Sequence, residues 1–285
     1  MIESGEIPPT VFGADTNVPK LREILLKRKI KWVASKTKDE ETYIEEDIQI
    51  PVRDGITIGV RIHKPATPPA DGSPIFVMYH GGGFCVGGVD NETLLLRRWA
   101  QLGGVAVNVD YRLAPEHQFP IPANDAYDAL KWTAANFESL GGNPKKGFFV
   151  GGISAGANFA SVLSLLYLKE QHTPRLTGVY LSILPCMHLE AVPEKYKHLY
   201  LSREQNAEAP SLNVAGMTMF GSKLLATQQF SISLTSTSQI TTTQTTSQNS
   251  IHQWPSLTTK TYRRPSFRFA VWTLSATRLS FTSVS

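Results

Sequence analysis

The sequence predicts an α/β fold with a mostly parallel central sheet that is covered by helices on both faces. Segments typical of buried strands alternate with segments of helical periodicity between residues 73 and 185. The predicted strands are continuous apolar runs rich in β-branched and aromatic residues, as in strands buried on both faces. This alternation favours parallel strands joined by helical crossovers.

The individual elements follow from local patterns. Residues 21–34 have apolar positions at helical spacing. Residues 42–52 and 55–65 alternate like two strands joined by a tight turn at Arg53-Asp54-Gly55. Buried strands are predicted at 73–80, 103–111, 147–154 and 176–185, and helices at 92–102, 123–140 and 155–171.

The charge is distributed unevenly along the 285 residues, which have a net charge of +4 and a pI near 9.0. All 24 acidic residues lie at or before Glu208, and the 22 basic residues of that part leave it with a net charge of −2. The other six basic residues are scattered between Lys223 and Arg278 and form no dense patch. We therefore expect no nucleic-acid partner.

Several features point to a cytoplasmic protein. No apolar run approaches the roughly 20 residues of a membrane span, and the N-terminal residues lack the pattern of a signal peptide. The two cysteines, Cys85 and Cys186, share no metal-ligand spacing and fit a reducing compartment, where both are expected as buried thiols.

A nucleophile candidate lies between a predicted strand and a predicted helix. Gly152-Ile153-Ser154-Ala155-Gly156 has the pattern Gly-x-Ser-x-Gly, in which glycines flank the serine because the turn is sharp. The helix that follows directs its positive end at Ser154, which favours a developing anion. An incidental serine in a glycine-rich connection is the alternative interpretation.

A second motif follows the predicted strand at 73–80. The residues His80-Gly81-Gly82-Gly83-Phe84 match the loop that supplies oxyanion donors in lipases and esterases. Backbone N–H groups can stabilise a developing oxyanion only where no side chain blocks the approach, and a glycine triplet meets that requirement. A flexible turn is the alternative, but both motifs occur in the expected order.

These motifs identify a resemblance to the hormone-sensitive-lipase-like, or fold-3, family of α/β-hydrolases. Residues 80–84, 110–117, 119–130 and 151–158 carry the resemblance, and residues 193–207 resemble its fungal branch. The resemblance implies an acylated nucleophile at Ser154 and oxyanion donors at the amides of Gly82, Gly83 and Ala155. It also implies supporting roles for His80, Gly81, Gly152 and Gly156.

The resemblance further implies a domain organisation and an activity. Residues 1–45 form an N-terminal cap segment, and residues 46–220 form the hydrolase core with a cap insert around 186–220. The implied activity is hydrolysis of small-molecule carboxylic esters through an acyl-Ser154 intermediate, with no cofactor and no metal. Two alternatives remain open: a related protein that binds a small ligand without turnover, and a non-functional product.

The sequence departs from the family at its C-terminus. A base and an acid should follow Ser154 in the order acid, then histidine, but no Asp occurs after Asp128 and neither residue can be identified. Of the 65 residues in 221–285, 27 are Ser or Thr, so this part is expected to be disordered or out of frame. The last strands of the eight-stranded parent sheet are then missing, which exposes a sheet edge.

An out-of-frame origin of the tail is supported by its codons. Read from one base upstream, codons permitted for residues 260–285 can spell the family's missing strand and acid motif. Trp272-Thr273 requires the bases tgg-acn, so the shifted codon is gac, which encodes Asp. The nucleotide sequence around codons 215–285 tests this hypothesis. A disordered linker or a Ser/Thr-rich stalk is the alternative.

Overall fold

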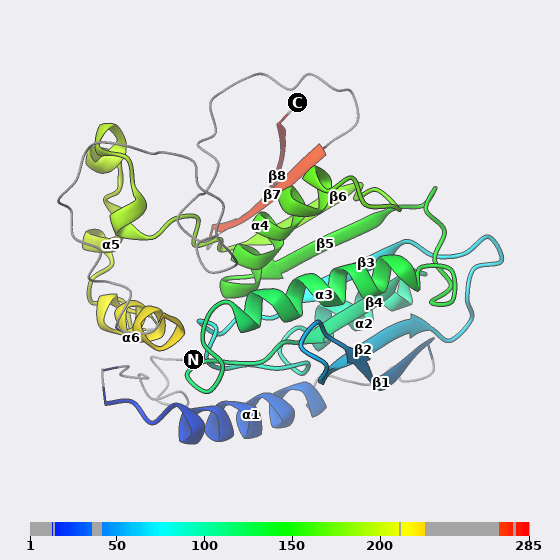
Figure 1. Cartoon of the computed structure of the whole chain (residues 1–285), viewed down its shortest axis with the longest axis horizontal. Coiled ribbons are helices and arrows are strands. Elements are labelled where there is room, and N and C mark those ends of the chain that lie inside the picture. The colour runs from blue at the N-terminus through cyan, green and yellow to red at the C-terminus, as the bar shows by residue number, and fades with distance from the viewer. Residues whose placement is uncertain are drawn as a thin grey trace.

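The computed structural model describes residues 13, 15–35, 42–210, 212–225, 268–275 and 278–284. Within this part an eight-stranded sheet has the order β1-β2-β4-β3-β5-β6-β7-β8 (Figure 1). Strands β4, β3, β5, β6 and β7 are parallel to one another, and β1, β2 and β8 pair in antiparallel fashion at the two edges. The predicted α/β class with a mostly parallel sheet is confirmed.

The strands and helices of the alternating part occur where the sequence places them. The strands are β1 (Tyr43–Pro51), β2 (Thr57–Pro65), β3 (Ile75–Tyr79), β4 (Val105–Asp110), β5 (Phe148–Ile153) and β6 (Gly178–Ser182). The helices are α1 (Val18–Ala34), α2 (Thr93–Gln101), α3 (Ile121–Ala135) and α4 (Ala155–Lys169).

The segment after β6, which the sequence predicts as a cap insert, contains short helices. They are η2 (Leu189–Ala191), η3 (Glu194–Leu199), α5 (Ser202–Gln205) and α6 (Val214–Leu224). Asn213 begins α6 by accepting a hydrogen bond from the Gly216 amide at 2.8 Å. Asn17 begins α1 in the same way, accepting from the Lys20 amide at 3.0 Å.

Strand β3 shows why its sequence is apolar at every position. Ile75, Val77 and Tyr79 face a core shared with α3 and α4, whereas Phe76 and Met78 face a smaller core with Leu96 of α2. Each of these five β3 residues is buried. A strand with helices on both faces has no solvent-exposed face. Its residues are therefore apolar at every position instead of alternating between apolar and polar.

The structure differs from the sequence expectation at the C-terminus. Residues 268–275 form β7 (Arg268–Ser275) and residues 278–284 form β8 (Arg278–Val284). Strand β7 pairs in parallel with β6 from Gly178↔Arg268 to Leu181↔Val271. The expectation that the last strands are missing is therefore wrong for these residues, because the segment still offers a backbone ladder to the edge of β6. Residues 221–224 of the predicted tail belong to helix α6, so the expectation of disorder is wrong for them, and residues 226–267, 276–277 and 285 lie outside the described residues.

Candidate active site

The predicted nucleophile lies on a strained turn between β5 and α4. Ser154 has φ 53° and ψ −116°, a conformation that costs a non-glycine residue about 1–3 kcal/mol. Its amide donates to the carbonyl oxygen of Ser182, the last residue of β6, at 2.9 Å. Ser154 is half-buried, so the turn holds its side chain at the carboxyl edge of the sheet, within reach of a ligand.

The two flanking glycines are required by close backbone contacts. A Cβ atom on Gly152 would overlap the carbonyl group of Gly156. A Cβ atom on Gly156 would overlap the carbonyl oxygen of Tyr79, the last residue of β3. Because both positions lack a Cβ atom, α4 can pack closely against β5 and β3 directly after the sharp turn at Ser154.

The glycine loop after β3 adopts conformations that favour glycine. Gly82 has φ 130° and Gly83 has φ 58°. A Cβ atom on Gly82 would overlap the Val86 carbonyl oxygen, and one on Gly83 would overlap the ring of Phe220 from α6. Because β3 and β5 are neighbouring parallel strands, this loop and Ser154 leave the same edge of the sheet.

His80 lies beneath the loop and is fully buried. Its Nδ1 is 2.8 Å from the Gly81 carbonyl oxygen, and its ring stacks on Tyr111 with centroids 4.2 Å apart. The Tyr111 hydroxyl donates to the His80 carbonyl oxygen at 2.8 Å. Burial lowers the pKa of His80 to about 4, so the ring is neutral at pH 7. These contacts hold the ring against the loop.

The low pKa of His80 predicts a loss of stability in mild acid. Its folded pKa lies below the unfolded value near 6.5, so the unfolded chain binds the extra proton as pH falls through that range. We expect the free energy of unfolding to fall by about 2 kcal/mol between pH 7 and pH 5. Urea denaturation at both pH values measures this loss, and His80→Gln should remove most of it. An equal loss in the variant would assign the effect to other groups.

Two residues that sequence reasoning missed fix the first glycine of the loop. The Gly81 amide donates to Glu92 Oε1 at 3.3 Å, and Asn91 Nδ2 donates to the Gly81 carbonyl oxygen at 3.3 Å. Burial raises the pKa of Glu92, and a neighbouring charge from Lys29 opposes that rise. Neither residue belongs to a recognisable motif.

The loop is covered by two helices that are remote from it in sequence. Val18 and Leu21 of α1 pack with Cys85, Val86 and the α6 residues Met219 and Phe220 in one apolar cluster. Arg22 Nε donates to the Cys85 carbonyl oxygen at 2.5 Å. The same guanidinium donates to the Ala114 carbonyl oxygen and pairs with Glu116 at 2.6 Å.

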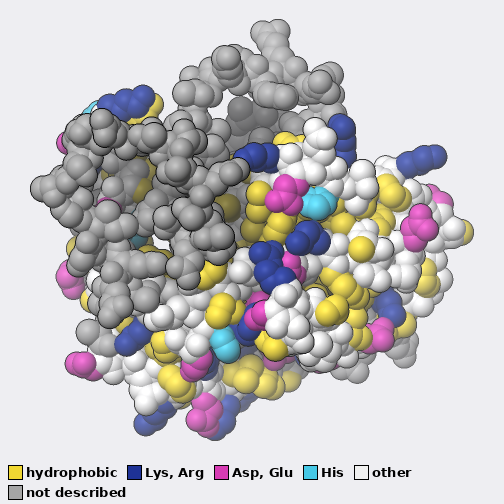
Figure 2. All heavy atoms as spheres, in the orientation of Figure 1, with side chains coloured by type: hydrophobic (Ala, Val, Ile, Leu, Met, Phe, Trp, Pro, Cys, Tyr) yellow, Lys and Arg dark blue, Asp and Glu magenta, His cyan; other side chains and the backbone are white. Residues whose placement is uncertain are grey.

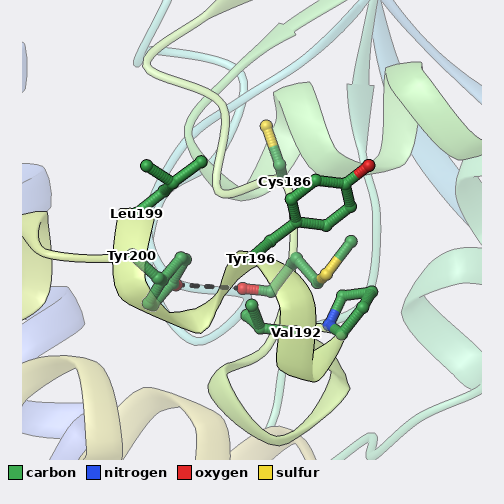
Figure 3. A pocket seen from close by; sticks show the side chains of 7 residues that line it. Cys186, Val192, Tyr196, Leu199 and Tyr200 are labelled. Carbon is green, nitrogen blue, oxygen red and sulfur yellow. Dashed lines mark hydrogen bonds between the residues drawn. The ribbon is translucent and has the colours of Figure 1, made fainter.

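An apolar pocket of about 290 Å³ lies in the cap insert (Figure 3). It is lined by Cys186, Met187, Val192, Pro193, Tyr196, Leu199 and Tyr200. The Tyr200 hydroxyl donates to the Met187 carbonyl oxygen at 3.1 Å. This hydrogen bond joins the two ends of the segment that lines the pocket. Asn158 Nδ2, one turn after Ser154 on α4, donates to the Pro185 carbonyl oxygen at 3.0 Å.

The two cysteines differ in burial. Cys85 is buried as expected, but Cys186 is exposed at the pocket, so the expectation of a buried thiol is wrong for Cys186.

The described histidines after Ser154 lie in α4's C-terminal connection and in the cap. His172 Nε2 lies 2.8 Å from Glu170 Oε2, which is a histidine–carboxylate pair. The pair follows the far end of the 15-residue helix α4, roughly 20 Å from Ser154 at 1.5 Å per residue. The ring nitrogen of His188 contacts the Glu190 amide, and His198 belongs to η3. The triad acid and histidine remain unassigned, and His252 lies outside the described residues.

Neither a metal site nor a membrane-spanning helix was found among the described residues. No group of three or more His, Cys, Asp or Glu side chains there could hold a metal ion. No described helix is long and apolar enough to cross a membrane.

Comparison with known proteins shows the family to which the chain belongs. The family described as alpha/beta hydrolase fold matches residues 76–248. An AB hydrolase superfamily protein of Schizosaccharomyces pombe is 43% identical over 175 residues, which are 61% of this chain and 52% of that protein. Versiconal hemiacetal acetate esterase of Dothistroma septosporum is 38% identical over 149 residues, or 52% of this chain and 45% of that protein. The chain thus spans about half the length of these curated relatives.

Solved structures give the same result. An esterase from Pyrobaculum calidifontis superposes with a TM-score of 0.67 at 33% identity, covering 79% of this chain and 69% of that chain. EstE1, a carboxylesterase cloned from a metagenomic library, has a TM-score of 0.63 at 32% identity, covering 74% and 68%. The fold and the family match define the class of α/β-hydrolases. Within that class, the chain belongs to the hormone-sensitive-lipase-like, fold-3 family, whose structural neighbours here are esterases.

Proposed function

We propose that this protein is a serine carboxylic-ester hydrolase that acts by two-step acyl transfer through an acyl-Ser154 intermediate. One observation supports this most directly. A half-buried serine is held at positive φ on a strand-to-helix turn, at the same sheet edge as a loop of three consecutive glycines. Strain of this kind persists where the surrounding structure enforces it, and it gathers at functional sites.

The proposed chemistry uses atoms on this edge. Ser154 Oγ attacks the ester carbonyl carbon and loses its proton, while the carbonyl π electrons move onto oxygen. The amides of Gly82, Gly83 and Ala155 donate to that oxyanion, and Ala155 opens α4, whose first-turn amides lack helical partners. The carbonyl then re-forms as the C–O bond to the alcohol breaks, and the leaving alkoxide takes up a proton that replaces the one lost by Ser154. Water adds to the acyl-Ser154 carbonyl, and breakdown of the resulting intermediate releases the carboxylic acid and restores the Ser154 hydroxyl.

The pocket in the cap insert supports a small apolar substrate. Its side chains are aliphatic, aromatic or sulfur-containing, and its volume of about 290 Å³ is at the lower end for ligand sites. The Asn158–Pro185 hydrogen bond ties this segment to the helix that follows Ser154. We propose that the pocket receives a short or medium acyl chain or an apolar alcohol group.

The proposed activity is weak, because no base and acid are assigned beside Ser154. An enzyme that has lost triad residues retains about 10³–10⁴-fold acceleration over water from binding and the oxyanion hole. We expect slow hydrolysis of p-nitrophenyl esters at that level. Rapid turnover that Ser154→Ala abolishes would show that the chain recruits a base and an acid from residues not assigned here.

Labelling with a fluorophosphonate probe tests the nucleophile separately from turnover. We expect covalent labelling that Ser154→Ala abolishes and that the exposed-serine control Ser139→Ala leaves unchanged. Tight binding of a small apolar acid without labelling would instead favour a non-catalytic ligand-binding relative. Absence of both would favour a non-functional product and would contradict the proposal.

A further inference from the structure

We propose that the outer face of α1 docks on an anionic phospholipid surface. Helix α1 carries six basic residues, Lys20, Arg22, Lys27, Arg28, Lys29 and Lys31, against the single acidic residue Glu23, a net charge of +5. Residues 1–208 as a whole have a net charge of −2, so the rest of that part carries −7. An anionic surface therefore attracts α1 and repels the rest of residues 1–208, which favours an orientation with α1 toward that surface.

The inner face of α1 is already used by the protein. Val18, Leu21 and Val33 are buried, and Arg22 is bound to Cys85, Ala114 and Glu116. Helix α1 thus lies along one edge of the molecule, and its other face points away from the sheet (Figure 1). The docking surface proposed here is that outer face, defined by Ile24, Leu26, Arg28, Ile30, Lys31 and Trp32.

The outer face combines basic and apolar side chains. Arg28 and Lys31 are exposed and have no carboxylate within ion-pair distance among the described residues. Beside them Ile24, Leu26, Ile30 and Trp32 expose between 39% and 51% of their surface. Figure 2 shows dark blue and yellow side chains, with some magenta ones between them, at the lower edge of the molecule, where Figure 1 places α1.

The apolar component distinguishes a lipid surface from a nucleic acid. At 100° per residue, Ile24 lies between Lys31 and Arg28, Trp32 lies beyond Arg28 on one flank, and Ile30 and Leu26 lie beyond Lys31 on the other. Phosphate backbones are bound by basic side chains and give no reason to expose aliphatic flanks. A helix in a membrane interface buries such flanks, while Lys and Arg reach the headgroups and Trp sits at the headgroup level.

Vesicle co-sedimentation of the full chain tests docking without requiring activity, so its outcome is separate from that of the proposed hydrolysis. Vesicles of phosphatidylcholine with 30% phosphatidylserine should pellet the protein at least tenfold better than phosphatidylcholine alone. The advantage should largely disappear at 0.5 M NaCl, because exposed charges are then screened. Equal binding to both vesicles would overturn the proposal.

Variants locate the surface. Arg28→Glu with Lys31→Glu should weaken binding at least 20-fold, since each basic residue near an anionic surface contributes about fivefold. The matched control Lys145→Glu with Lys169→Glu changes the same charge at exposed positions elsewhere and should stay within twofold of the unaltered protein. Equal weakening in both double variants would overturn the placement on α1. Should the first double variant fail to fold, Lys31→Glu alone should weaken binding about tenfold or more, and unchanged binding would overturn the placement.

Two further readouts test the mode of binding. Brominated phosphatidylcholine mixed into the anionic vesicles should quench tryptophan fluorescence, and Trp32→Phe should remove that quenching. Quenching that persists in Trp32→Phe would place another surface in the membrane. Binding to single-stranded RNA at the same salt concentration, without binding to the vesicles, would show a polyanion surface and would also overturn the proposal.

Discussion

Gly156→Ala is expected to lower the free energy of unfolding by about 4 kcal/mol or more and to abolish covalent labelling of Ser154. The new methyl group would overlap the Tyr79 carbonyl oxygen and lie 2.6 Å from the His80 carbonyl oxygen, well inside contact distance of both. Both are backbone atoms of β3 and of the glycine loop, so neither can rotate away. Overpacking against backbone must move whole elements, which places the cost at the upper end for single substitutions.

Gly221→Ala is the matched control for this prediction. Gly221 lies within α6, and a Cβ atom there would meet nothing within 4 Å. Alanine is favoured over glycine in helices by about 0.8–1 kcal/mol, so this variant should be slightly more stable. Chemical denaturation of both variants measures the difference. A Gly156→Ala protein with unchanged stability and labelling would show that α4 can shift along β3 without cost.

Asp125→Ala is expected to cost about 3–5 kcal/mol, because it removes one partner of a buried ion pair. Asp125 is fully buried at the start of α3, and its carboxylate accepts from the Arg112 amide at 3.0 Å and from the Arg112 guanidinium at 2.8 and 2.6 Å. Hydrogen bonding to Asp125 raises the pKa of Arg112. The guanidinium also stays charged at pH 7 without this partner, because an arginine side chain in water already has a pKa above about 12. Urea denaturation at pH 7 measures this loss.

The control for Asp125 is the other carboxylate of the same guanidinium. Asp54 lies 2.7 Å from Arg112 Nη2, but 42% of its side chain is exposed. Water replaces this partner readily, so Asp54→Ala should change stability only slightly. Losses of similar size in the two variants would mean that Arg112 depends on the pair of acids jointly rather than on the buried carboxylate.

The elements that position Ser154 could be predicted because local patterns decide them. Runs such as residues 75–79 are apolar at every position, and only a strand covered on both faces uses all of them. The turn at Ser154 and the loop at Gly81–Gly83 could also be located, because backbone strain and close approach leave glycine as the acceptable residue. These constraints act within a few residues and are visible in sequence.

Other parts of the site depend on contacts between distant segments. Glu92 meets Gly81, and Arg22 meets Cys85 across 63 residues, yet neither belongs to a periodic pattern. Strand β7 was not expected because its segment lies in a Ser/Thr-rich stretch, whereas its pairing depends on the free edge of β6. The amino-acid composition describes a long stretch on average. A short segment within that stretch is enough to add a strand to the sheet, so composition alone does not exclude β7.

The hydrogen bond from Asn158 to Pro185 has a consequence for how selectivity could change. Ser154 begins the first turn of α4 and Asn158 ends it, so one turn fixes both the oxygen proposed to react and the start of the segment predicted as a cap insert. The pocket side chains from Cys186 to Tyr200 lie beyond that start and take no part in the packing of β5 on α4. Under the proposed function, exchange of this segment between relatives would therefore alter which molecules fit while the turn at Ser154 stays intact, so substrate fit and reactivity could change independently.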